Sequence, residues 1–272
     1  MIEQVKGTQN IVDENSTKYL YIRDQFHKSF INYGYSYTQT PHIEYTELFE
    51  KSIGVNSEIV SKQMYQFDDK GGRSLVLRPE GTSSIVRYHS QFNKEQTKHY
   101  AYFGQMFRYE NPQKNRYREF TQGGIEILGQ IDEYSDFQVI SDSIRFLKNL
   151  DLEFTLEINT IGSLEDRNAY IDNLHKYLTL NKDKLSDESL EKLNNNTLRI
   201  LDSNNKTDFD VIRDAPEILE YINEDSILKF NLLKSLLNKN KIAYRENTKL
   251  VRGLDYYNDL TFEFITKDGL VL

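Results

Sequence analysis

The most constraining feature of this 272-residue sequence is a series of short strand-like segments at hairpin spacing in its first half. Tyr65 to Phe67 and Ser74 to Leu77 flank the stretch DDKGG, an acidic, glycine-rich connection that indicates a turn between antiparallel strands. Further strand-like segments follow at His99–Phe103, Gln105–Tyr109, Glu119–Gln122 and Ile125–Leu128. This order predicts an α+β fold, in which an antiparallel sheet is flanked by helices, rather than alternating βα units.

Helical periodicity appears on both sides of these strands. Tyr19, Ile22 and Phe26 fall on one face of a predicted helix from Ser16 to Asn32, with Ser16 as its N-cap and Gly34 at its end. Three further helices are predicted in a glycine-poor block, at Ser163–Leu180, Asp187–Leu193 and Ser226–Leu237. We expect strand character to return only at Leu250, and we divide the chain into a core at 1–160, a helical insertion at 161–245 and a return to the core at 246–272.

Composition excludes several classes of site. The sequence has no cysteine, which excludes disulfides, thiolate nucleophiles and cysteine-ligated metals. No window approaches the roughly 18 apolar residues of a membrane span, so we expect a cytoplasmic protein without membrane contact. The net charge of −8 argues against a surface that binds nucleic acid throughout, although Met106 to Arg118 is locally basic, with Arg108, Lys114, Arg116 and Arg118 against Glu110.

The stretch LVRGLDYYNDLTFEF, Leu250 to Phe264, raises a question about function. Its second half alternates like a half-buried strand, yet its first half carries Arg252, Asp255, Tyr256 and Tyr257. Taken singly, the arginine is explained by an ion pair with Asp255, and the tyrosines by packing with satisfied hydroxyls.

Two other stretches carry clustered polar groups. LRPEGT, Leu77 to Thr82, places Glu80 and Thr82 at the end of an apolar strand, where Thr82 can cap the following helix or both can face a cavity and receive an ammonium group. The hairpin from Phe103 to Gly129 places Arg108, Gln122 and Glu126 inside apolar runs, where a buried charge needs a partner.

Together the three stretches match one family in order, spacing and residue type. The sequence resembles the histidyl-tRNA synthetases of bacterial type, which are class II aminoacyl-tRNA synthetases. TPHIEYTELFEKSIG is similar to motif 1 with its terminal proline, FRYENPQKNRYREFTQGGIE to motif 2, and LVRGLDYY to the signature of histidyl enzymes. KGTQNI near the N-terminus, NTLRILDSN and the Ala215–Pro216 pair also resemble the family.

The resemblance implies a role for each matching residue. It assigns Glu80 and Thr82 to the amino group of histidine, Gln122 to the region of its carboxylate, and Glu126 with Tyr257 to the imidazole; Tyr256 belongs to the same pocket. It further implies that Arg108 and Arg252 bind the ATP α-phosphate as catalytic residues. Glu110, Arg116 and Arg118 lie in the motif 2 loop, which faces ATP and the acceptor end of tRNA(His).

The same resemblance implies ATP with Mg²⁺, no dedicated metal site, and a homodimer formed through motif 1 near Thr40 to Gly54. Lys6, Asn10 and Asp13 depart mildly from the family pattern. After TFEFITKDGLVL the family continues into motif 3 and an anticodon-binding domain, so we expect weak activity from this stretch by itself.

Two alternatives remain open. A catalytically silent paralogue, such as the regulatory subunit of ATP phosphoribosyltransferase, would keep the fold but would not need LRPEGT or an arginine before LDYY. An adenylating enzyme for another amino acid would show no preference for histidine, and the pairing of Glu126 with Tyr257 argues against it.

Overall fold

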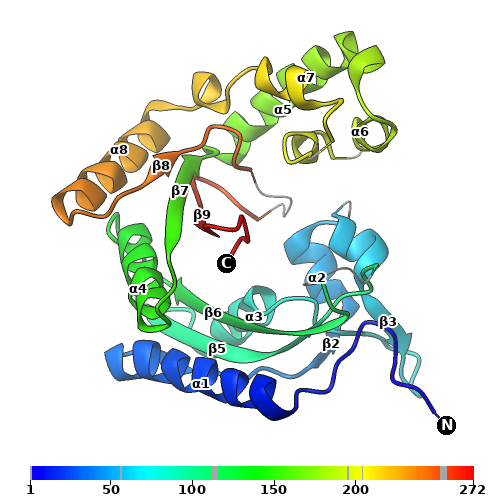
Figure 1. The fold of residues 1–272 in the computed structure, drawn as a ribbon, viewed down its shortest axis with the longest axis vertical. Helices are drawn as coiled ribbons and strands as arrows, with labels where there is room; N and C mark the ends of the chain where they lie inside the picture. The colour runs from blue at the N-terminus through cyan, green and yellow to red at the C-terminus, as the bar shows by residue number, and fades with distance from the viewer. Residues whose placement is uncertain (1, 56, 112–115, 195, 204, 252–255) are drawn as a thin grey trace. The chain divides into compact units, whose positions relative to one another are not determined.

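The structure is a computed structural model of the 272-residue chain, and it describes all residues except 1, 56, 112–115, 195, 204 and 252–255. The chain divides into two compact units, Met1–Leu152 and Glu153–Leu272. The first unit contains two sheets and the second contains one, each unit has its own helices, and Figure 1 shows the elements of both.

The first unit is organised by a long antiparallel hairpin of β5 (Lys98–Phe107) and β6 (Glu119–Leu128), with the short β1 (Ser36–Tyr37) parallel to β5. The prediction of two broken segments on each side was wrong, because both strands run without interruption through their glycines. Each of these glycines lies where a neighbouring side chain leaves no room for a Cβ: the nearest atom would be within 2.9 Å at Gly104, Gly123 and Gly124.

The two faces of this hairpin pack against different helices. Residues of odd number, such as Ala101 and Phe103, pack with Phe26 and Phe30 of α1 (Asp13–Phe30) and with Phe146 of α4 (Ser135–Asn149). Residues of even number pack instead with Ile85 of α3 (Thr82–Phe92); they are Tyr100, Tyr102, Met106, Phe120 and Leu128. The alternation of strand side chains thus sends one set to each side of the sheet, and Figure 1 shows α1 and α3 on opposite sides of it.

Helix α1 begins earlier than predicted. Its N-cap is Val12, and Ser16 lies within the helix, so the assignment of Ser16 as the cap was wrong. The acidic Asp13 and Glu14 occupy the first turn, where negative charge interacts favourably with the helix dipole. The helix is followed by a 3-10 turn, Ile31–Tyr33, which ends at Gly34 with a φ of 91°, in agreement with the predicted role of that glycine.

A second sheet in the first unit has the order β2-β4-β3 and is antiparallel throughout. The predicted hairpin is confirmed as β3 (Tyr65–Asp68) and β4 (Ser74–Leu77), whose turn is held by the Asp69 carboxylate as it accepts from Gly71 and Arg73. The remaining elements are β2 (Ile43–Tyr45), α2 (Thr46–Ile53) and a π-helical turn, Ile59–Gln63.

The second unit is built on β7 (Phe154–Thr160), which pairs antiparallel with β9 (Leu260–Thr266) and parallel with β8 (Arg245–Glu246). Strand character therefore returns at Arg245, earlier than the predicted Leu250. The expected alternation in β9 was also wrong, because its two most buried residues, Thr261 and Phe264, lie on opposite faces.

Helices supply most of the second unit. They are α5 (Leu164–Leu180), α6 (Asp187–Lys192), α7 (Phe209–Arg213) and α8 (Glu224–Lys239), with 3-10 turns at Lys182–Lys184, Thr197–Ile200 and Ile218–Tyr221. Tyr170, Leu174 and Leu178 on one face of α5 form the centre of its core. Among the described residues, no helix has the length and apolar character needed to cross a bilayer.

Candidate functional site

The first element of the candidate site is the LRPEGT loop between β4 and α3. The buried carboxylate of Glu80 accepts hydrogen bonds from the backbone N–H groups of Thr82, at 2.6 Å, and Ser83, at 2.9 Å. These are the first two N–H groups of α3, whose N-cap residue is Gly81, so the Glu80 side chain satisfies donors at the start of the helix. Of the two alternatives for Thr82, capping of the helix was wrong, and its hydroxyl makes another contact.

That contact joins the loop to the long hairpin. The Thr82 hydroxyl donates to the Glu126 carboxylate at 2.6 Å, between residues 44 positions apart in the chain. Glu126 lies on the even-numbered face of β6, directly opposite Tyr100 of β5, and this face packs against α3. Glu80, Thr82 and Glu126, which sequence resemblance assigned to one pocket, therefore lie close together.

The environment of Glu126 favours its protonated form. Burial raises the pKa of the carboxyl group to about 7, the neighbouring negative charge of Glu80 acts in the same direction, and the hydrogen bond from Thr82 opposes them. A carboxyl group that titrates near neutral pH can donate or accept a hydrogen bond at little cost, which suits contact with an imidazole whose own pKa is close by.

Tyr102 fills the space between the loop and the hairpin, and sequence reasoning missed it. A Cβ at Gly81 or at Gly124 would lie 2.2 Å and 2.3 Å, respectively, from atoms of the Tyr102 ring. The loop and β6 can both approach this ring only because they carry glycine at these two positions. The glycines in EGT and QGG were the available signal, since they indicate a close approach of a bulky neighbour.

Gln122 contributes a polar atom without a partner. Its side-chain carbonyl oxygen is buried and accepts no hydrogen bond from any residue that the structure describes. Gln122 lies on the same face of β6 as Glu126, opposite Gly104. A buried acceptor left without a donor costs free energy, so this oxygen marks a place where a ligand N–H or O–H group would be stabilised.

Arg108 is held against the same loop. Its Nε donates to the backbone carbonyl of Pro79 at 2.9 Å, and its guanidinium lies 5.1 Å from the centre of the Phe120 ring. The contact with Pro79 places Arg108 beside the residue that precedes Glu80. The structure thus brings Arg108 to the loop that carries two of the predicted histidine-binding residues.

The start and the end of the motif 2 loop are joined to each other and to the N-terminal segment. Arg116 pairs with Glu110 at 3.6 Å, and the Arg118 guanidinium lies 3.9 Å from the centre of the Tyr109 ring. The Arg118 N–H donates to the Gly7 carbonyl at 2.6 Å. Lys114, counted in the basic stretch, lies outside the described residues.

The remaining predicted residues belong to the second unit. Arg252 and Asp255 lie outside the described residues. The rings of Tyr256 and Tyr257 stack with their centroids 5.0 Å apart, and the Tyr257 carbonyl accepts from Arg167 of α5 at 2.9 Å. Tyr257 also packs against the core of the second unit.

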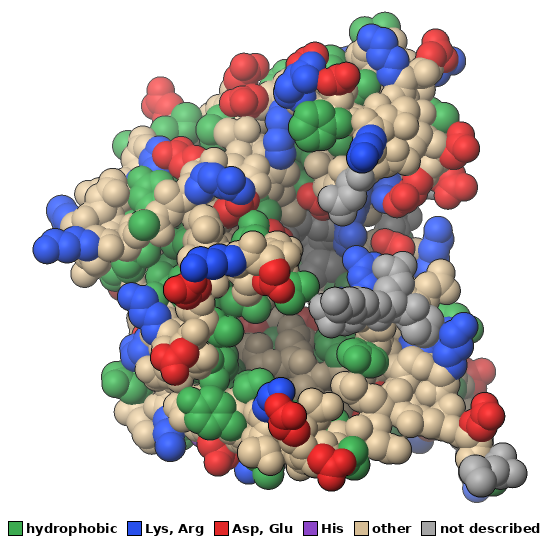
Figure 2. All heavy atoms as spheres, viewed as in Figure 1, with side chains coloured by type: hydrophobic (Ala, Val, Ile, Leu, Met, Phe, Trp, Pro, Cys, Tyr) green, Lys and Arg blue, Asp and Glu red, His purple; other side chains and the backbone are tan. Residues whose placement is uncertain are grey.

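Charged side chains of both signs and a few carboxylates surround the candidate site. On the face seen in Figure 2, basic and acidic side chains are interspersed. In the described part of the chain, no group of three or more His, Asp or Glu side chains is arranged to hold a metal ion. The nearby carboxylates already have partners: Glu80 binds the N-terminus of α3 and Glu126 binds Thr82.

Comparison with solved structures identifies the class. The apo histidyl-tRNA synthetase of S. aureus superposes with a TM-score of 0.72 at 33% identity, covering 97% of this chain and 61% of that one. A Bacillus halodurans protein described as an ATP phosphoribosyltransferase regulatory subunit/histidyl-tRNA synthetase has the same TM-score, 0.72, at 22% identity, over 100% of this chain and 75% of that one. The α+β fold, with its largely antiparallel sheets, is therefore that of a class II aminoacyl-tRNA synthetase.

Sequence comparison narrows the class to a family. The family profile described as histidyl-tRNA synthetase matches residues 7–269. The histidine–tRNA ligase of Mycoplasma mobile is 41% identical over 273 aligned residues, which cover 98% of this chain and 61% of that protein. The chain belongs to the histidyl-tRNA synthetase family, and it spans 61% of the length of this relative.

Proposed function

We propose that this chain carries the catalytic region of a histidine–tRNA ligase, which activates histidine with ATP to histidyl-adenylate and transfers it to tRNA(His). The observation that carries the proposal is the convergence of the LRPEGT loop and the long hairpin, in which Thr82 contacts Glu126 and Arg108 contacts Pro79. Family membership supports the same assignment.

Histidine binding is proposed for the polar groups on the α3 side of the hairpin. Glu80 presents a buried carboxylate for the ammonium group, and Thr82 lies between it and Glu126. The unsatisfied Gln122 carbonyl would accept from the α-ammonium group of the substrate, next to its carboxylate. Glu126 would bind the imidazole, and the resemblance adds Tyr256 and Tyr257 to the same role. A site that hydrogen-bonds a buried substrate group can reject analogues lacking it by roughly 10⁴-fold.

The proposed chemistry is attack of the histidine carboxylate on the α-phosphorus of ATP, with pyrophosphate as the leaving group. Negative charge accumulates on the phosphoryl oxygens during this displacement, and a positioned guanidinium stabilises it. Arg108 is proposed for this role from its position beside the loop, and Arg252 from the resemblance. Glu110 and Arg116, which pair with each other, are proposed to contact ATP.

Mg²⁺ is proposed to accompany ATP, because Mg²⁺ commonly takes its ligands from nucleotide phosphates and water. The proposed partners also include the acceptor end of tRNA(His) and a second copy of the chain bound through motif 1. Support for the second copy comes from β2, which exposes Ile43 by 50% and Tyr45 by 54%. The division into a core at 1–160, an insertion at 161–245 and a core segment at 246–272, and a cytoplasmic location, belong to the same proposal.

The test is histidine-dependent exchange of labelled pyrophosphate into ATP by a version of the chain extended through motif 3, together with calorimetric titration of histidine. Exchange is expected with histidine and not with other amino acids. Arg108→Ala should lower the exchange rate by about 10² to 10³, as the loss of one such donor typically does. Arg73→Ala, which removes an exposed arginine from the β3–β4 turn, serves as the control.

Other outcomes would separate the alternatives. Histidine binding without exchange would favour a regulatory paralogue of the synthetases over a ligase. Exchange supported equally by several amino acids would favour a different adenylating specificity. Absence of both exchange and histidine binding would contradict the proposed function.

A further inference from the structure

Arg78 is a buried arginine to which the proposed reaction assigns no part. It is 3% exposed, and it directly precedes Pro79, whose carbonyl holds Arg108. Burial lowers the pKa of its guanidinium, which shows that this environment penalises the charge. Because removing a cation from water costs free energy, a position that required packing alone would be better filled by an apolar side chain.

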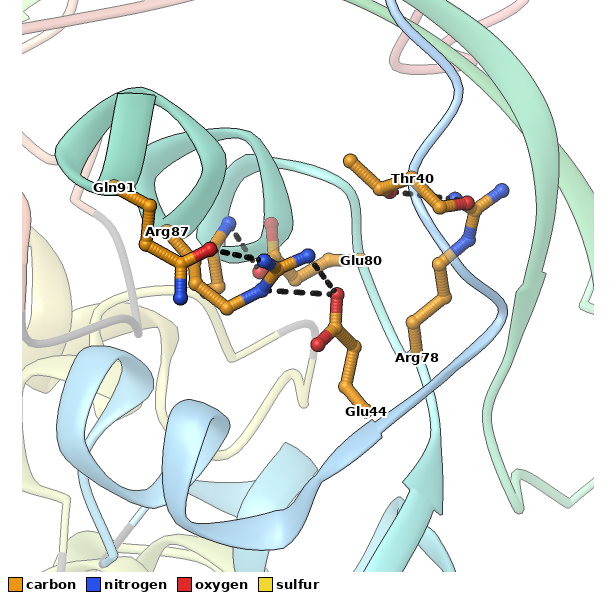
Figure 3. A network of polar contacts seen from close by, with 7 residues as sticks. Thr40, Glu44, Arg78, Glu80, Arg87 and Gln91 are labelled. Atoms are coloured by element: carbon orange, nitrogen blue, oxygen red, sulfur yellow. Dashed lines mark hydrogen bonds and ion pairs between the residues drawn. The ribbon is translucent and has the colours of Figure 1, made fainter. Parts of the chain in front are cut away.

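The Arg78 side chain connects two segments that are distant in sequence. One terminal nitrogen donates to the carbonyl of Thr40 at 2.9 Å and to its hydroxyl at 2.8 Å, while Nε donates to the carbonyl of Gln105 at 3.0 Å. Thr40 immediately precedes Pro41 of motif 1, and Gln105 lies in β5, two residues before motif 2 begins at Phe107. Figure 3 shows Arg78 directed at Thr40, apart from the neighbouring pair of Arg87 and Glu44.

The backbone of Arg78 makes parallel connections. Its N–H donates to the His42 carbonyl at 2.9 Å, and its carbonyl accepts from the N–H of Phe107 at 3.0 Å. Phe107 is followed by Arg108, whose Nε returns to the Pro79 carbonyl. Arg78 and Pro79 therefore both contact the chain at the end of β5, where Arg108 begins: the Arg78 carbonyl accepts from Phe107 and the Pro79 carbonyl accepts from Arg108.

We propose that Arg78 is a positioning residue, which locks Thr40, next to the motif 1 proline, and the β5 strand to the LRPEGT loop and thereby fixes the orientation of Arg108. The inference deepens the proposed function, since it names the residue that aligns the phosphate-binding guanidinium. The role requires a forked donor, because the acceptors at Thr40 and Gln105 are reached from different nitrogens of one planar group.

Gly104 provides a way to displace the guanidinium without removing it. A Cβ at Gly104 would lie 2.7 Å from a terminal nitrogen of Arg78 and 4.0 Å from its central carbon. Gly104→Ala therefore collides only with the far end of a flexible side chain, and the strand can keep its backbone. Arg78→Lys keeps the charge but lacks the fork, and Arg78→Met removes both.

The direct measurement is the Nε–H signal of Arg108 in nuclear magnetic resonance spectra of the full chain, in which the bond to Pro79 slows exchange with water. We expect this protection to fall at least tenfold in Arg78→Met, Arg78→Lys and Gly104→Ala. Arg87→Met, which breaks the nearby ion pair with Glu44, is the matched control for loss of an arginine and should leave the signal protected. Gly71→Ala, in the exposed β3–β4 turn, is the control for the glycine change.

The second measurement is the pyrophosphate exchange rate. A misaligned Arg108 should lower kcat by about 10- to 100-fold and leave the KM for histidine within about twofold, because a small misplacement acts mainly on the transition state. If Arg78 had a purely structural role, Arg78→Met and Arg87→Met would lower thermal stability alike, without lowering kcat selectively over KM. In that case Arg78→Lys, which keeps the charge, would recover the thermal stability.

The outcomes separate this proposal from the proposed function. Persistent protection of the Arg108 Nε–H in Gly104→Ala would overturn the role of Arg78, as would kcat within twofold of the parent chain. Gly104→Ala also decides the question if Arg78→Met does not fold. Loss of protection in the Arg78 variants, without any exchange in the otherwise unaltered version extended through motif 3, would support the role of Arg78 and contradict the ligase assignment.

Discussion

Two buried carboxyl groups, Asp208 in the second unit and Glu126 in the first, differ in how many hydrogen-bond donors surround them. Asp208 of the second unit is 0% exposed and accepts four hydrogen bonds. The donors are the Ser186 backbone and three hydroxyls, at 2.6 to 2.8 Å, from Ser186, Ser189 and Ser203. Burial alone would raise the pKa of Asp208, but these donors together outweigh it, so the pKa lies below its ordinary value.

Glu126 of the first unit has few hydrogen-bond donors, and its pKa is shifted in the opposite direction. It accepts one hydrogen bond from Thr82, has the negative Glu80 nearby, and its pKa is raised to about 7. A carboxylate saturated with donors holds segments of its own unit together and has little capacity left for a ligand. A carboxyl group with few donors is destabilised in its charged form until a ligand supplies them, and that difference separates the candidate site from a structural cluster.

The largest expected effect is on Asp208. Asp208→Asn removes the charge that four donors stabilise and places an amide N–H among them, which should cost about 3 kcal/mol of local stability. Hydrogen exchange of peptides spanning 186–213 measures the loss. Asp210→Asn, in an exposed ion pair with Arg213, is the control and should change stability by less than about 0.5 kcal/mol. Equal protection in the two variants would show that the hydroxyl cluster is not structural.

In contrast to Asp208→Asn, the substitution Glu126→Gln should increase stability at neutral and higher pH. The folded-state pKa of Glu126 is raised, so above pH 7 the folded protein bears the cost of a buried charge that the unfolded chain does not. Stability should fall as the pH rises from about 4.5 to 7, and Glu126→Gln should flatten this slope and stabilise the first unit at pH 8 by about 2 kcal/mol. Denaturant unfolding at several pH values tests this, and a destabilised variant at pH 8 would contradict it. Histidine binding should weaken in the same variant.

Asp208 and Glu126 should also differ in how they change the stability of the folded protein at low pH. Because the pKa of Asp208 is lowered in the folded state, its contribution is present above the unfolded value near 4 and is lost as the pH falls through the folded value. Below about pH 4, the parent chain should lose stability relative to Asp208→Asn by about 1.4 kcal/mol per pH unit at most. Thermal unfolding between pH 3 and 5 measures the difference, and parallel curves would show that Asp208 keeps its ordinary pKa.

The sequence predicted the segments of this site better than the contacts within it. The strands, α3 and the grouping of Glu80 with Glu126 followed from hydrophobic pattern and family motifs. Hydrophobic pattern and family motifs did not predict the contacts of Glu80 with the start of α3, the position of Tyr102, or the hydrogen bonds of Arg78 to Thr40 and Gln105. Each depends on which residues of β5 and β6 lie opposite one another, and a shift of one residue in that register would exchange the two faces of the sheet.

The errors in strand boundaries have a similar origin. β8 has only two residues, and its pairing with β7 defines it, whereas its own pattern does not. Gly104 and Gly124 suggested breaks in strands because glycine is unfavourable in a regular sheet, but here neighbouring side chains occupy the space that a Cβ would take. Local propensity could not reveal these tertiary contacts.

The smallest expected effect concerns the coupling of Glu80 to Glu126. Removing the negative charge in Glu80→Gln should lower the pKa of Glu126 by less than about one unit, because burial is the larger cause of its shift. A glutamine oxygen can still accept from one of the two N–H groups that Glu80 binds at the start of α3, so the helix should persist. Titration of the Glu126 carboxyl carbon by nuclear magnetic resonance gives the pKa directly. An unchanged pKa in a folded variant would mean that the two carboxyl groups do not interact, and that burial alone prepares Glu126 for a ligand.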